Sequence, residues 1–187
     1  MKTEITRPEV IRFAYYQESG DKNFGSCLWA FFDCDIQDNA LSIRSDCGNY
    51  AYSYWSVKGN FIGFLAGLSR DYIANKLLGN PERISFDGTR ENIRQALEGN
   101  DDYEAADLEE MLDELQAEME EHDPDHGHDA IYKCVEDWLD NYGFDGLNAW
   151  DPIELDWTPQ QKRIIEIFVT CIQPEMRKYR RGEREIQ

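Results

Sequence analysis

The stretch CLWAFFDCDIQDNALSIRSDCGNYAYSYWSV, residues 27–57, carries the patterns that decide the fold of this 187-residue chain. Its first ten residues are dense in aromatic and aliphatic side chains, which is typical of a covered strand. Leu41 and Ile43 then alternate with polar residues, and a second alternation is carried by three tyrosines, Tyr50, Tyr52 and Tyr54. The segments QDN and CGN between these runs have turn chemistry. We therefore predict an antiparallel meander, to which VIRFAYYQE (residues 10–18) adds a strand.

The apolar spacing changes at residue 60 from the period of a strand to that of a helix. Helical stripes then recur in six segments: residues 61–68, 71–79, 86–99, 105–121, 130–143 and 158–181. In the third of these, Thr89 suits the N-cap and Gly99 the C-terminal stop.

These patterns predict an α+β protein, with an N-terminal antiparallel sheet of three to four strands packed against helices and a C-terminal acidic helical portion. We expect a sheet domain over residues 1–100 and an acidic helical extension packed on it over residues 101–187, or one single domain.

The formal net charge of −19 is extreme for this length. Self-repulsion at that level costs stability, so the charge is either tolerated for solubility or retained for a basic partner. It argues against direct binding of DNA, RNA or anionic lipid, which favours a basic face. The N-terminus is polar and no apolar run approaches the roughly 20 residues of a membrane span, so we expect a soluble, cytoplasmic protein.

The acidic residues are concentrated between Asp101 and Asp140, where seventeen Asp and Glu accompany a single basic residue, Lys133. Carboxylates three or four residues apart on a helix lie about 5–6 Å from one another. That spacing is comparable to the separation of phosphates along a DNA strand, so an acidic helix can occupy a cationic groove built for nucleic acid. A solubilising helix face is the alternative interpretation. The predicted partner-binding residues are Glu109, Glu110, Asp113, Glu114, Glu118 and Glu121.

Two further groups of residues have the chemistry of a metal or reactive site. The loop HDPDHGH offers His122, His126 and His128 as weak candidate ligands for Zn, Ni or Cu, but a polar loop without metal is the favoured interpretation. The five cysteines include no C-x-x-C pair, which favours reduced thiols over a disulfide framework or a zinc site. Cys47 lies in a predicted turn, where an exposed thiol would be a candidate nucleophile. A nucleophile also needs a neighbouring base or cation, and we favour a buried or inert cysteine.

The motifs of serine hydrolases, nucleotide-binding loops and zinc proteases are absent from the sequence, so we expect no enzymatic activity and no cofactor. A hydrolase or nuclease that uses Asp46, Cys47 or the histidine loop is the less favoured alternative. The tyrosine alternation suits a half-buried sheet face, a protein-binding surface or a platform for stacked bases, and we favour packing.

The segment RKYRRGER (residues 177–184) is basic, in contrast to the rest of the chain. It is able to pair with the acidic helix of its own chain or of a second copy, which makes a homodimer one prediction. A basic helix end favoured by the helix dipole is the alternative.

The Ser-Asp-x-Gly-x-Tyr-x-Tyr run at residues 45–52, Trp55 and the segment 61–78 resemble a family of proteins encoded by bacteriophages and prophages. The similarity covers residues 12–78. It implies a phage or mobile-element context, in which small acidic proteins often antagonise host defence nucleases or Cas complexes. The resemblance assigns no catalytic residues.

The sequence therefore leads to one favoured function. We expect a phage-encoded, non-enzymatic inhibitor of a bacterial defence nuclease or CRISPR-type complex. It would act by nucleic-acid mimicry on a basic host protein or ribonucleoprotein. The alternative is an accessory protein-interaction module that is acidic for solubility and works through its Tyr/Trp sheet face.

Overall fold

The computed structural model describes residues 8–22, 24–97, 105–144 and 147–182. It divides into two compact units. The sheet unit comprises residues 1–80 and 158–187, and the acidic unit comprises residues 81–157. The first boundary lies at residue 80, whereas the sequence led us to expect it at residue 100. In addition, the chain returns to the sheet unit after the acidic unit, at residue 158. Among the described residues, no helix combines the length and apolarity that crossing a bilayer would require.

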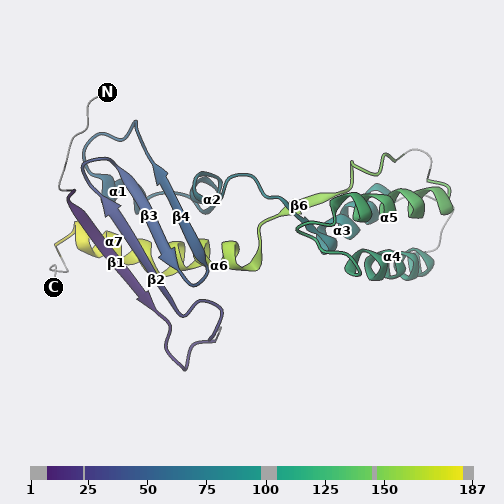
Figure 1. Cartoon of the computed structure of the whole chain (residues 1–187), viewed down its shortest axis with the longest axis horizontal. Coiled ribbons are helices and arrows are strands. Elements are labelled where there is room, and N and C mark those ends of the chain that lie inside the picture. Colours follow the sequence, from purple (N-terminus) through teal and green to yellow (C-terminus); the bar gives the residue numbers. More distant parts are fainter. Residues whose placement is uncertain (1–7, 23, 98–104, 145–146, 183–187) are drawn as a thin grey trace. The chain divides into compact units, whose positions relative to one another are not determined.

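The sheet unit contains a four-stranded antiparallel sheet in the order β1-β2-β3-β4 (Figure 1). The strands are β1 (Val10–Tyr16), β2 (Trp29–Asp35), β3 (Ala40–Ser45) and β4 (Gly48–Ser53). The β3–β4 turn uses Gly48 at φ +111°, a backbone conformation that side-chain-bearing residues rarely adopt. The predicted α+β class and antiparallel N-terminal sheet are confirmed.

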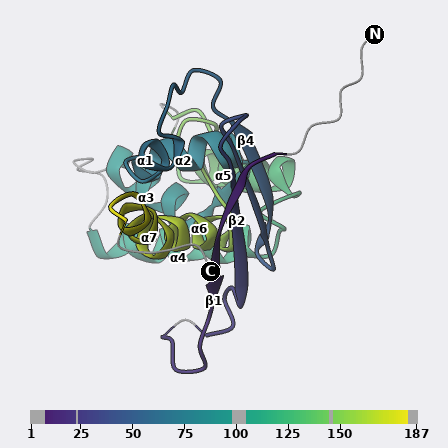
Figure 2. The same cartoon turned by 90° about the vertical axis from the view of Figure 1, so that its left-hand side faces the viewer.

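The alternation read from the sequence separates the two faces of this sheet. Ala30, Phe32 and Cys34 of β2 are fully buried, while the residues between them are only half-buried. The buried face packs against helices on one side of the sheet (Figure 2), and the ring of Phe32 lies 5.8 Å from that of Phe168. The helices of this unit are α1 (Phe61–Leu65), α2 (Arg70–Leu78), α6 (Pro159–Ile167), the π-helix η1 (Phe168–Ile172) and α7 (Gln173–Arg180).

The C-terminal helices begin at a complete capping box. The Thr158 hydroxyl accepts a hydrogen bond from the Gln161 N–H, and the Gln161 side chain accepts one from the Thr158 N–H. Pro174 lies in the first turn of α7, where its missing N–H is tolerated, and the helical path continues through η1. Gln173 is buried, and its amide Nε2 donates to the carbonyls of Leu65 and Leu68 at the end of α1.

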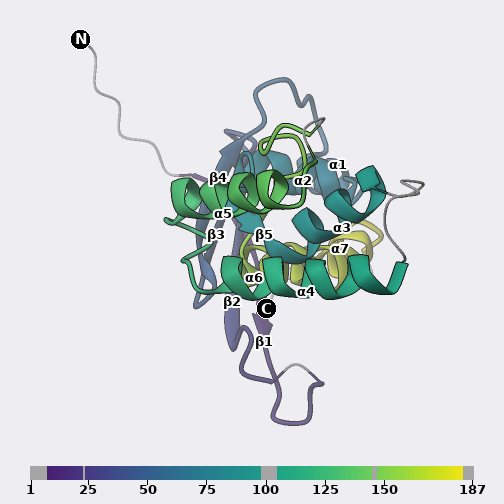
Figure 3. The ribbon, with the colours of Figure 1, turned by 90° about the vertical axis from the view of Figure 1, so that its right-hand side faces the viewer.

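In its described residues, the acidic unit is built from three helices and a two-stranded antiparallel pair. Its elements are β5 (Arg83–Ser85), α3 (Phe86–Leu97), α4 (Ala105–Glu120), α5 (His128–Asn141) and β6 (Glu154–Asp156). Both α3 and α5 pack against α4 (Figure 3). The Leu/Met stripe predicted for the acidic helix supplies much of the core, with Leu112, Leu115 and Met119 fully buried.

The prediction for Thr89 is wrong. Helix α3 begins at Phe86, and Thr89 is a buried residue within it. Its hydroxyl accepts a hydrogen bond from the Glu154 N–H of β6, which is a contact between distant segments rather than a local cap. Gly99, the predicted end of this helix, lies outside the described residues.

Candidate functional site

The six carboxylates predicted to bind a partner belong to α4 or to the residues directly after it, and the structure separates them into two rows. The inner row is Glu109 and Asp113, which face α3. Arg94 binds Glu109 through two bonds, Nε–Oε1 at 2.7 Å and Nη2–Oε2 at 3.0 Å. Arg90 Nη2 donates to Glu109 Oε2 at 2.8 Å and to Asp113 Oδ1 at 2.5 Å.

These ion pairs neutralise the inner row within the chain. The hydrogen bond from Arg94 lowers the pKa of Glu109 below its usual value. Arg94 also pairs with Glu91 on its own helix. The side chains of Arg90 and Arg94 are only 20% and 30% exposed. Their ion pairs with Glu109 and Asp113 link α3 to α4.

The outer row contains Glu110, Glu114, Glu118 and Glu121, all of them exposed. Glu110, Glu114 and Glu118 are four residues apart, so they follow one another along one face of α4, and Glu121 continues the row directly after the helix ends at Glu120. The Tyr142 hydroxyl of the acidic unit donates to Glu114 Oε2 at 3.1 Å, and that hydrogen bond raises the pKa of Tyr142. Within the described part of the chain, no Lys or Arg forms an ion pair with this row.

The charge of the chain is divided unequally between the two units. Residues 81–157 contain 25 Asp and Glu against four Lys and Arg, whereas the sheet unit contains 13 against 15. The acidic unit therefore carries the whole of the net negative charge. Lys133, the one basic residue of α5, is itself paired with Glu136 and Asp137.

The histidine loop does not assemble its imidazoles into one ligand set. His122 is half-buried after α4, His126 is exposed, and His128 begins α5 with Nε2 3.2 Å from the Pro124 carbonyl oxygen. In the described residues, one group of three or more ligand-type side chains converges, and it lies elsewhere, at Cys27, Asp46 and Cys47.

The structure agrees with the favoured interpretation of Cys47 as a buried cysteine. Cys47 is 4% exposed, and its Sγ donates to the Ser26 carbonyl oxygen at 3.0 Å. Burial raises the pKa of both the Cys47 and the Cys27 thiol. Protonated thiols are weak nucleophiles, so the geometry gives no support to a hydrolase built on Cys47. The sequence offered no signal that Cys27, twenty residues earlier, would lie beside it.

The tyrosine alternation is explained by packing. Tyr54 is 3% exposed and its ring contacts those of Phe61 and Phe64. The Tyr50 hydroxyl donates to the Cys47 carbonyl oxygen at 2.8 Å. Trp55, by contrast, is 89% exposed.

The outer sheet face, opposite the buried face that packs against the helices, carries a cluster of aromatic side chains. The sequence patterns did not single out this cluster. Tyr16 and Trp29 are exposed, and the ring of each contacts the ring of Phe31. The guanidinium groups of Arg12 and Arg44 lie 5.0 and 5.7 Å from the centre of the Phe31 ring. The sequence signal that could have revealed this cluster is strand alternation: its aromatic residues occupy the positions of β1 and β2 that alternate with the buried ones.

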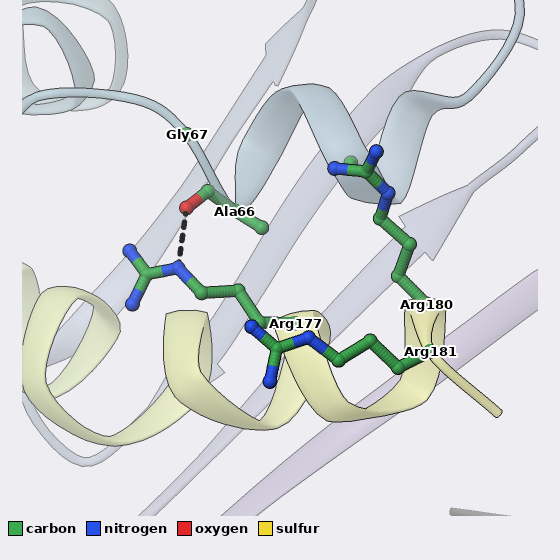
Figure 4. Close-up of a pocket in the computed structure, with 6 residues that line it drawn as sticks. Ala66, Gly67, Arg177, Arg180 and Arg181 are labelled. Atoms are coloured by element: carbon green, nitrogen blue, oxygen red, sulfur yellow. Dashed lines mark hydrogen bonds between the residues drawn. The ribbon is translucent and has the colours of Figure 1, made fainter. Parts of the chain in front are cut away.

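The basic segment after residue 176 borders a cavity of about 460 Å³ in the sheet unit (Figure 4). The residues that line it are Gly63, Ala66, Gly67, Arg177, Arg180 and Arg181. Arg177 Nε donates to the Ala66 carbonyl oxygen at 3.1 Å, and Lys178 pairs with Glu175 on its own helix. Three guanidinium groups around one cavity have the chemistry to hold an anion. Arg184, the last arginine of the basic segment, lies outside the described residues. The homodimer predicted from this segment stays a prediction.

Comparison with known proteins places this chain in a phage context. The model of the family Phage_phiTE_072, described as a phage family, matches residues 12–178. The chain belongs to this phage family. The match includes all of the described helices and strands except the N-terminal end of β1 and the last residues of α7. No curated protein and no solved structure matches the chain.

Proposed function

We propose that this phage-family protein is a non-enzymatic inhibitor of a bacterial defence nuclease or CRISPR-type complex, and that it occupies a basic nucleic-acid-binding groove with the outer row of α4. One observation carries the proposal. The acidic unit concentrates the charge of the chain, and among its described residues arginines neutralise the inner row but form no ion pair with the outer row.

The separation of the two rows gives each a distinct role. Glu109 and Asp113 fix the helix, through Arg90 and Arg94, in a defined position in the acidic unit. The outer row is left to Lys and Arg of a partner. Like charges at this spacing destabilise an isolated helix by a few tenths of a kcal/mol per pair. A cationic groove would offset that cost, and the association would weaken steeply with salt.

This proposal places the protein in the cytoplasm of the infected cell, where it would meet a basic nucleic-acid-binding protein or ribonucleoprotein. It needs neither a cofactor nor direct contact with nucleic acid.

The test is phage plating on bacteria that carry a defined defence system and express this protein. Wild-type protein should raise the plaquing efficiency of a phage that the system normally restricts. Replacing Glu110, Glu114, Glu118 and Glu121 by Lys should abolish that rescue.

A matched control makes the same change of charge in the sheet unit, at four exposed acidic residues: Glu9, Glu18, Asp38 and Asp71. This variant should still rescue the phage. If the two variants behave alike, net charge rather than the outer row matters, and mimicry by α4 is refuted.

A second candidate is the accessory protein-interaction module, favoured by the exposed aromatic cluster on the outer sheet face. Replacing Tyr16 and Trp29 by Ser would remove its most exposed rings. Loss of rescue in this variant, with the outer-row Lys variant unaffected, would assign the function to the sheet face.

A further inference from the structure

A loop and a turn of the sheet unit bring three ligand-type side chains together. Cys27 lies in the loop two residues before β2, and Asp46 and Cys47 form the turn between β3 and β4. Because Ala30 of β2 pairs with Ser45 of β3, the start of one strand lies beside the end of the other. The two Sγ atoms and a carboxylate oxygen of Asp46 all lie within 4.8 Å of one another.

The dimensions of this group suit a tetrahedral metal ion. With Zn–S bonds of about 2.3 Å, two sulfur ligands of one zinc ion lie roughly 3.8 Å apart. The observed limit of 4.8 Å therefore requires only small side-chain adjustments. Thiolates select soft or borderline ions such as Zn²⁺ over Mg²⁺ or Ca²⁺.

The surroundings already orient the ligands. The Asp46 carboxylate accepts hydrogen bonds from the backbone N–H groups of Leu28 (2.8 Å) and Trp29 (3.5 Å), an arrangement typical of the outer shell of metal sites. Cys27 is 1% exposed and Cys47 4%, so both sulfur atoms are shielded from water. The Ser45 hydroxyl donates to the Gly48 carbonyl oxygen at 2.6 Å and accepts from the Cys47 N–H at 3.1 Å, which holds the turn.

The charge of the occupied site follows from its ligands. Two thiolates and one carboxylate around Zn²⁺ leave a net charge of −1, and binding releases two thiol protons to solvent. Arg163 from α6 lies close enough to both thiols to interact with them electrostatically. Its Nε is buried and has no hydrogen-bond partner in the described part of the chain. Its Nη1 already pairs with Glu166 at 2.8 Å, so Arg163 would compensate only part of the remaining negative charge.

We propose that Cys27, Asp46 and Cys47 form a zinc-binding site that joins the β1–β2 connection to the β3–β4 turn, with the fourth position left to water. The site would stabilise one end of the sheet. It is independent of the outer row of α4, which lies in the other unit.

The experiment uses the full-length protein, reduced and stripped of metal with a chelator, and titrates it with Co²⁺ and then with Zn²⁺. Wild-type protein should bind one Co²⁺ per chain with a thiolate-to-cobalt charge-transfer absorption, and Zn²⁺ should displace the cobalt. Cys27→Ser and Cys47→Ser should each abolish the absorption. Asp46→Asn should weaken binding by more than about tenfold, since even outer-shell changes cost that much.

Two controls separate this site from other thiols and from the histidine loop. Cys34→Ser removes a buried thiol outside the group, and the double variant His126→Ala, His128→Ala removes the loop imidazoles. Both should bind Co²⁺ as the wild type does. Zn²⁺ should also raise the melting temperature of the wild type but not of Asp46→Asn, which tests the site without deleting a core thiol. Absence of charge-transfer absorption in the wild type, or its loss in the histidine variant, would overturn the proposal.

Discussion

Neutralising the outer row of α4 should make the protein more stable. The perturbation replaces Glu110, Glu114, Glu118 and Glu121 by Gln, which keeps side-chain length and helix propensity. The amide carbonyl introduced by Glu114→Gln would still accept the hydrogen bond from Tyr142. The variant therefore removes charge and little else.

The magnitude follows from the positions of the four residues. Glu110, Glu114 and Glu118 form two like-charge pairs within α4, and Glu121 adds a third directly after the helix ends at Glu120. Each such pair costs roughly 0.2–0.5 kcal/mol. The free energy of unfolding should therefore rise by about 1 kcal/mol at low salt. For a unit of this size, such a change raises the melting temperature by roughly 4–8 °C.

The assay is thermal and urea unfolding of the wild-type and Gln variants at low and high salt. The gain should shrink with added salt, because exposed charges are screened. A matched inner-row variant, Glu109→Gln with Asp113→Asn, should lose stability instead, since it deprives Arg90 and Arg94 of their partners. If the outer-row variant is no more stable than wild type at low salt, repulsion between these carboxylates does not lower the free energy of unfolding, and the prediction is refuted.

Three further predictions concern the sheet unit. Tyr54→Phe should raise the free energy of unfolding by about 1 kcal/mol in chemical denaturation, because the buried Tyr54 hydroxyl lacks a hydrogen-bond partner among the described residues. Gln173→Leu should lower it by roughly 1–3 kcal/mol, because the carbonyls of Leu65 and Leu68 would lose their donor; equal stability would contradict this. Burial raises the pKa of Cys34 from 9.0 to about 12, so the protonated thiol contributes stability that is fully present below pH 9.0 and is lost as the pH rises toward 12. Cys34→Val should make stability fall less steeply over that interval, and an unchanged slope in melting temperature against pH would count against it.

The local features of this fold could be predicted from the sequence. Alternation in residues 27–57 is enough to predict the strands, because one sheet face is buried and the side-chain period is two. The stripe of Leu112, Leu115 and Met119 gives the buried face of α4 for the same reason, with a helical period.

Features that depend on contacts between distant segments could not be predicted. The acidic face was predicted as one surface, whereas the arginines of α3 neutralise Glu109 and Asp113 and, in the described part of the chain, do not pair with the other four residues. Thr89 has the chemistry of a cap, but β6 supplies its partner. The turn position of Cys47 could be predicted, but no local pattern reveals that Cys27 lies beside it. Each of these required strand or helix pairing that sequence periodicity does not encode.

The most direct test of the central claim is competition for one groove. A defence complex that this protein inhibits would be loaded with a fluorescent DNA ligand and titrated with the protein, while fluorescence anisotropy follows the DNA. Wild-type protein should displace the DNA, less effectively as salt rises, and the variant with Lys at Glu110, Glu114, Glu118 and Glu121 should not. Stable binding of both the protein and the DNA to the same complex, or equal displacement by the Lys variant, would contradict nucleic-acid mimicry by α4.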